Sequence, residues 1–66
     1  MNKPEYKPEV KLLGEDGNAF AVLGKTKAAL KKAGADKEFT DMFLEEAMSG
    51  DYDHLLNTVM EYVDVV

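Results

Sequence analysis

The sequence contains no cysteine, no arginine and no tryptophan, and its single histidine is His54. Without cysteine, disulfides and thiolate metal sites are excluded, and a reducing cytoplasm is the expected compartment. All eight basic residues are lysines, whose point charge is less suited than arginine to paired contacts with phosphates or bases. Because candidate nucleophiles and bases are so few, we expect a protein that is not an enzyme and that binds no cofactor or metal.

Long apolar stretches are also missing. The longest one, from Ala19 to Leu23, is far shorter than the ~20 residues of a membrane-spanning helix. The N-terminal sequence MNKPEYKPEV mixes charged residues with proline and lacks the apolar core of a signal peptide. We therefore expect a soluble cytoplasmic protein with no membrane partner.

The 66 residues are enough for one small domain, and 45% of them are apolar, so a hydrophobic core can form. Residues 1–8, which contain both prolines, are expected to form a flexible tail, which leaves 9–66 as the single domain. A domain of this size buries only about 60% of the surface of its unfolded chain. Association with a second copy would bury more, and we expect self-association, with a homodimer as its simplest form.

The net charge of −5 is unevenly distributed along the chain. Residues 1–34 hold seven lysines and four acidic residues, a net charge of +3. Residues 35–66 hold one lysine and nine acidic residues, a net charge of −8. If the fold keeps these segments apart, the molecule has a basic end and an acidic end.

Apolar residues recur at helical spacing over three segments, each preceded by an asparagine or aspartate that can cap a helix. The expected helices span about 18–33, 36–49 and 51–62, with caps at Asn18, Asp36 and Asp51. Gly34 and Gly50 follow the first two segments, at positions where glycine commonly ends a helix.

Val10 and Leu12 alternate with polar residues within 9–13, which predicts a short strand, and a lone strand needs a partner. Within the chain the candidate partner is the segment 62–66, whose β-branched residues suit either a strand or a last helical turn. The other candidate is a second chain, which would pair at the strand edge. The expected fold class is therefore mainly α, with α+β as the alternative.

The tripeptide Gly24-Lys25-Thr26 matches the end of a phosphate-binding loop. The first glycine of that loop would fall at position 19, which is alanine, and the tripeptide lies inside an expected helix. A nucleotide site is therefore not expected. Gly24 belongs instead with Ala21 and Ala28 to a small-residue face, which is either indifferent surface or a place where another backbone comes close.

Acidic residues gather on the second expected helix, at Glu38, Asp41, Glu45 and Glu46. The last two lie near the end of the helix, where its dipole disfavours negative charge. The group forms either a solvated face or a surface for a basic protein partner. The candidate partner-contact residues are thus Ala21, Gly24, Ala28, Glu38, Asp41 and Glu45.

Lysines flank the apolar stripe of the first expected helix. They are Lys25, Lys27, Lys31 and Lys32. These side chains are either solvated charges or contacts for a nucleic acid, and the net negative charge of the chain works against the second interpretation.

His54 lies beside Asp53 and Asp51 at the start of the third expected helix. An N-cap role for Asp51 and a favourable dipole interaction for Asp53 account for this pattern. A role of the cluster beyond capping is left open.

The strings DGNAFAVLGKTKAALKKAG and FLEEAMSGDYDHLLNTVMEYVDV resemble a set of small uncharacterised proteins from phages and mobile elements. The resemblance covers about residues 10–65 and implies an accessory protein that contacts host or phage proteins, without assigning any site. We therefore expect a non-enzymatic interaction or regulatory module that acts through its acidic surface or its apolar helix faces. The alternative is an accessory protein that binds nucleic acid through the lysines of the first helix.

Overall fold

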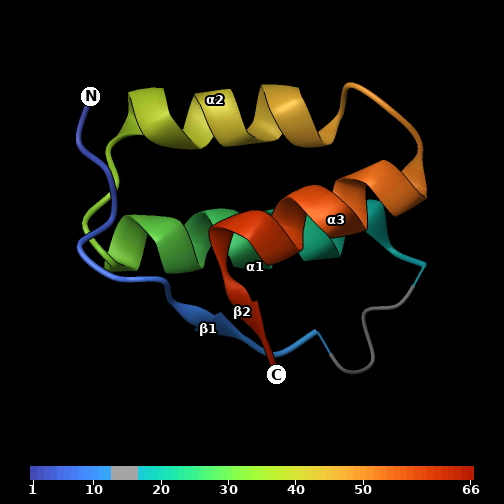
Figure 1. Cartoon of the computed structure of the whole chain (residues 1–66), viewed down its shortest axis with the longest axis horizontal. Coiled ribbons are helices and arrows are strands. Elements are labelled where there is room, and N and C mark those ends of the chain that lie inside the picture. Colours follow the sequence, from blue (N-terminus) through green and yellow to red (C-terminus); the bar gives the residue numbers. More distant parts are fainter. Residues whose placement is uncertain (13–16) are drawn as a thin grey trace.

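The computed structural model describes residues 1–12 and 17–66, and its elements follow the order strand, helix, helix, helix, strand (Figure 1). They are β1 (Glu9–Val10), α1 (Ala19–Lys32), α2 (Lys37–Ala47), α3 (Tyr52–Tyr62) and β2 (Asp64–Val65). Helix α2 packs on α1 and α3, and the strands contact the opposite side of those two helices. The predicted mainly α fold with a small β component is confirmed, and each helix lies within its predicted range.

Each helix begins at the cap that the sequence predicts. The side chains of Asn18, Asp36 and Asp51 each accept a hydrogen bond from the backbone N–H three residues later, at 2.9–3.1 Å. These bonds satisfy one of the N–H groups that the first turn of a helix leaves unpaired. Helix α1 ends at Lys32 with Ala33 as its C-cap, and Gly34 follows with a φ of +108°, a left-handed conformation that glycine adopts without strain.

The two strands pair in parallel, with Glu9 opposite Asp64 and Val10 opposite Val65. The pairing extends beyond β1, because the Asp64 N–H donates to the carbonyl of Pro8 at 2.8 Å. A parallel pair requires a long crossover, and here the three helices supply it. The strand predicted at 9–13 therefore finds its partner within the chain. The described strand is shorter than predicted, since β1 covers Glu9–Val10 and residues 11 and 12 do not belong to it, and the last predicted residue, Leu13, lies outside the described residues.

The C-terminal segment 62–66, which the sequence leaves between helix and strand, changes from one to the other at Val63. Helix α3 ends at Tyr62, and Val63 has extended backbone angles, φ −138° and ψ 162°. Its side chain is buried, whereas both residues of β2 are exposed. Burial of Val63 against the helices thus directs the chain out of α3 and into the ribbon.

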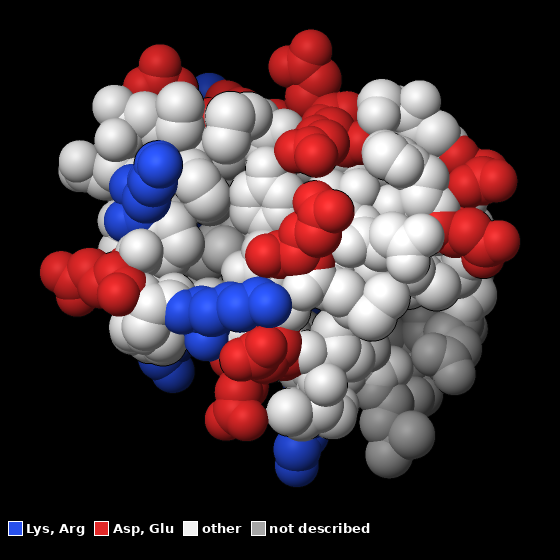
Figure 2. Space-filling view, in the orientation of Figure 1, with Lys and Arg blue, Asp and Glu red and all other residues white. Residues whose placement is uncertain are grey.

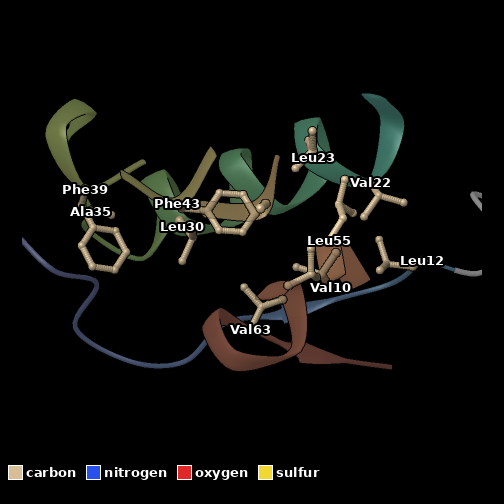
Figure 3. Close-up of a cluster of buried hydrophobic side chains, with 12 residues drawn as sticks. Val10, Leu12, Val22, Leu23, Leu30, Ala35, Phe39, Phe43, Leu55 and Val63 are labelled. Carbon is tan, nitrogen blue, oxygen red and sulfur yellow. The ribbon is translucent and has the colours of Figure 1, made fainter. Parts of the chain in front are cut away.

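One core joins β1, the three helices and Val63 (Figure 3). Its largest fully buried side chains include Phe43, Leu30, Val22, Val59 and Val63. Phe43 and Leu30 are 0% exposed, so α1 and α2 meet without water between them. None of the described helices has the length and apolar character needed to cross a membrane.

Residues 1–8, for which the sequence predicts a flexible tail, lie against the α1–α2 connection (Figure 1). The Asn2 N–H donates to Asp36 Oδ2 at 2.7 Å, and the Asp36 N–H donates back to the Asn2 carbonyl at 3.1 Å. The Glu5 N–H donates to the carbonyl of Ala33 at 2.8 Å, near the C-terminus of α1. Proline disfavours a helix here, and the extended chain pairs instead with backbone groups at the ends of two helices.

Two glycines of the chain are expected to respond oppositely to substitution by alanine. Among the described residues, a Cβ added at Gly24 meets nothing within 4 Å beyond its own helix, so Gly24→Ala should stabilise the fold by about 1 kcal/mol. Gly34→Ala forces alanine into the left-handed conformation and should destabilise it by about 1–2 kcal/mol. Urea unfolding followed by circular dichroism measures both, and a destabilised Gly24→Ala variant would contradict the open environment described.

Candidate functional site

A groove of about 640 Å³ opens between the N-terminal segment, α2 and the last turn of α3. Apolar and aromatic side chains line it together with charged residues from both sides. They are Lys3, Pro4, Tyr6, Lys7, Phe39, Met42, Glu46, Glu61 and Tyr62. We call this feature the aromatic groove.

The floor of the aromatic groove is held in place by ring packing. The Tyr62 ring lies 5.6 Å from that of Phe39 and 5.0 Å from that of Phe43, both edge to face at 64°. Phe43 is fully buried and Phe39 is buried, so the half-exposed Tyr62 rests on rigid core residues. A ligand that contacts Tyr62 would therefore meet a surface that needs little rearrangement.

A hydrogen bond fixes the polar edge of the groove, where the Tyr62 hydroxyl donates to Glu46 Oε2 at 2.7 Å. Burial raises the pKa of Tyr62 to about 12, with further contributions from this hydrogen bond and from the charges of Glu46 and Glu61. The phenol therefore stays protonated at neutral pH and holds the Glu46 carboxylate beside the ring. Both carboxylates lie close enough to affect the same hydroxyl group.

The two walls of the groove carry opposite charge. Lys3 and Lys7 belong to the N-terminal segment, whereas Glu46 and Glu61 belong to α2 and α3. Lys7 forms an ion pair with Asp64, 3.5 Å from Nζ to Oδ1, so its charge is balanced within the chain. On the face shown in Figure 2, acidic side chains gather over the two helices and most of the visible lysines lie toward the N-terminal segment, where acidic side chains lie directly beside them.

The acidic candidates from the sequence lie next to this groove. Glu38, Asp41 and Glu45 are exposed and occur at spacings of three and four residues, so they share one face of α2. Their row runs beside Met42 and Glu46, which line the groove. We call these three residues the acidic ridge. Glu38 lies 3.4 Å from the N-terminal amine, and Asp41 lies 3.2 Å from Lys37.

The small-residue candidates lie elsewhere, on α1, which contributes no residue to the aromatic groove. Gly24 and Ala28 are exposed and Ala21 is half-buried. Within the described part of the chain, no other segment comes within 4 Å of a Cβ placed at Gly24. The structure thus does not bring the two candidate sets together, and it leaves contact of the small-residue face with a partner as a prediction.

The tripeptide at 24–26 lies in the middle of α1, as the sequence predicts. The Thr26 side chain is fully buried, and its hydroxyl donates to the Val22 carbonyl of the same helix at 2.8 Å. Lys25 Nζ lies 3.4 Å from the carbonyl oxygen of Lys11. These contacts belong to the packing of a helix and not to a phosphate-binding loop.

His54 and Ser49 close the corner between α2 and α3. His54 Nε2 lies 2.9 Å from the Glu46 carbonyl oxygen, and the Ser49 hydroxyl donates to the same oxygen at 2.7 Å. That carbonyl lies in the last turn of α2 and also accepts a hydrogen bond from the Ser49 backbone N–H at 3.2 Å. A Cβ at Gly50 would lie 2.8 Å from His54 Cγ, so glycine leaves room for the ring. His54 therefore has a structural role in addition to the Asp51 cap.

A second, smaller hollow of about 280 Å³ lies where the start of α1 meets the α2–α3 corner. Its lining is mostly apolar and includes Phe20, whose side chain is 86% exposed, and Met48, which is 58% exposed. This hollow leaves apolar helix surface uncovered, and such surface and a strand edge are the two routes by which self-association is predicted. Homodimer formation stays a prediction.

The aromatic groove was not predicted from the sequence. Tyr6 lies in the segment interpreted as a tail, and Tyr62 follows Glu46 by 16 residues, so nothing local joins them. One signal was present, namely a glutamate near the end of α2, where the helix dipole disfavours it. The hydrogen bond from Tyr62 now gives Glu46 a favourable contact at that position.

The raised pKa of Tyr62 predicts a late phenol titration. Because the folded protein favours the protonated phenol, this contribution to stability is present below pH 10 and is lost as the pH rises toward about 12. In near-ultraviolet absorbance titrations of the folded protein, Tyr62→Phe should remove a phenolate signal with a midpoint near pH 12. Loss of a signal centred near pH 10 instead would contradict the burial of the phenol and its hydrogen bond to Glu46.

The likeness of residues 10–65 to small phage proteins stays an expectation from the sequence. Comparisons with protein-family models, with curated proteins and with solved structures find no match to this chain.

Proposed function

We propose that the protein is a non-enzymatic binding module whose acidic side contacts a basic segment of another protein. The observation that carries this proposal is the placement of the acidic ridge, Glu38, Asp41 and Glu45, directly beside the aromatic groove. A charged rim next to an apolar, aromatic centre is the usual anatomy of a protein-binding surface. The resemblance to small uncharacterised proteins from phages and mobile elements, expected from the sequence, implies the same kind of role.

The charge of the second half of the chain supports a basic partner. Residues 35–66 carry a net charge of −8, and Lys37, the one lysine among them, is already bonded to Asp41 at 3.2 Å. Complementary charge speeds encounter with a partner and selects against acidic surfaces. The exposed positions of the ridge suit this steering role, because they lose little hydration before contact.

A fluorescein-labelled decalysine peptide tests the proposal by fluorescence anisotropy. The protein should bind it at low salt, with an affinity that falls as salt rises, and should not bind the matching decaglutamate peptide. The triple variant Glu38→Gln, Asp41→Asn, Glu45→Gln should weaken binding by about fivefold or more, since it removes three charges next to the peptide.

The same assay with labelled duplex DNA addresses the alternative function through the α1 lysines. Binding of DNA together with no binding of decalysine at high micromolar protein would reject the proposal in favour of that alternative. Absence of binding by both probes would also reject the acidic surface as the functional one.

A further inference from the structure

We infer that the aromatic groove receives an arginine side chain from the partner's basic segment, with the guanidinium group between the Tyr62 ring and the carboxylates of Glu46 and Glu61. The inference rests on the proposed function and adds the location and chemistry of its anchor. The acidic ridge attracts a basic chain, whereas the groove selects one side chain of it.

The shape of the groove fits an elongated side chain with an apolar stem. Phe39 and Met42 contribute apolar surface from α2, and Pro4 and Tyr6 close the opposite side. The volume of about 640 Å³ lies within the range of ligand-binding pockets, so the groove has room for an arginine side chain and parts of the residues beside it. Burial of the methylene stem of arginine on these residues releases water from apolar surface.

The chemistry of the groove favours a planar cation over a compact one. Tyr62 presents its ring beside the Glu46 carboxylate, to which its own hydroxyl is bonded at 2.7 Å. A guanidinium group can stack on the ring and also donate two parallel hydrogen bonds to a carboxylate, which an ammonium group cannot do. Glu61, the residue before Tyr62, supplies a second carboxylate at the same end of the groove.

The lysine wall does not oppose this assignment. Lys7 is paired with Asp64, and Lys3 is exposed, so its charge is screened by solvent. The segment that presents the arginine also carries backbone carbonyls, and Lys3 can donate to them. The arginine therefore enters with its guanidinium group toward the carboxylates of α2 and α3. The backbone of its segment then lies toward Lys3 on the opposite wall.

Two labelled peptides of equal length test the anchor: one alternates arginine with leucine, and the other alternates lysine with leucine. In fluorescence anisotropy the arginine peptide should bind at least about fivefold more tightly, because only it makes paired and stacked contacts. Equal affinity of the two peptides would overturn the assignment of an arginine.

Matched charge variants locate the site. Glu46→Gln and Glu61→Gln should each weaken binding of the arginine peptide by about tenfold, because each removes a carboxylate that contacts the cation. Glu45→Gln removes the same charge from the acidic ridge and should weaken it less than about twofold. Circular dichroism of the three variants should match that of the unsubstituted protein, since all three positions are exposed.

The outcomes separate the anchor from the proposed function. If all three variants weaken binding equally, the acidic surface attracts the peptide diffusely, so the proposed function stands and the groove assignment is wrong. If neither the arginine peptide nor decalysine binds at high micromolar protein, both proposals are wrong.

Discussion

Phe43→Ala is expected to lower the free energy of unfolding by about 3–5 kcal/mol. The side chain is 0% exposed and packs edge to face on Tyr62 with ring centres 5.0 Å apart. Replacing a buried phenylalanine by alanine typically costs about 3–5 kcal/mol, because it removes apolar contacts and leaves a cavity. A chain of 66 residues has a total stability of about 3–10 kcal/mol, so this single loss consumes a large part of it.

The neighbouring residue provides the control for Phe43→Ala. Met42 is 40% exposed and lies at the edge of the aromatic groove, so Met42→Ala should cost no more than about 1 kcal/mol. Chemical denaturation followed by far-ultraviolet circular dichroism compares the two variants with the unsubstituted protein. A Phe43→Ala variant with an unchanged midpoint would show that Phe43 is not the centre of the core.

Val63→Asp is expected to destabilise the fold by about 3–5 kcal/mol, because it places an unpaired carboxylate at a position that is 1% exposed. Val63 joins α3 to β2 and packs in the common core (Figure 3). A helical continuation of α3 through 62–66 would give these residues a different pattern of burial. The variant therefore tests the end of the helix as well as the core.

Val65→Asp makes the same chemical change two residues later, at a position that is 42% exposed. Its carboxylate stays in water, so the cost should be less than about 1 kcal/mol and reflect only the preference of β-branched residues for strands. Thermal unfolding of both variants at neutral pH gives the comparison. Similar losses at both positions, or a larger loss at Val65, would contradict the β1–β2 register.

The helices could be predicted because their signals are local. Asn18, Asp36 and Asp51 each cap the helix that follows them, and a cap depends only on a backbone N–H three residues away. Because a strand needs a partner, the sequence left two alternatives for 9–13, namely pairing with 62–66 or pairing with a second chain. The choice between them depended on burial of Val63, which only the packed helices determine.

The groove could not be predicted because it is built from long-range contacts. Tyr6 reaches it only because the Asn2 and Glu5 backbone groups pair with the α1–α2 connection. Tyr62 reaches it because the last turn of α3 packs on Phe39 and Phe43. The acidic ridge, in contrast, was visible in the sequence, since Glu38, Asp41 and Glu45 share one helix face by spacing alone.

A two-dimensional NMR titration of the isotope-labelled protein with the arginine–leucine peptide tests binding at the aromatic groove most directly. The largest shifts are expected at the backbone amides of Phe39, Met42 and Tyr62, and unchanged signals at Gly24 on α1. Shifts confined to the lysine-bearing surface of α1, or no shifts at saturating peptide, would contradict a basic-segment site at the aromatic groove.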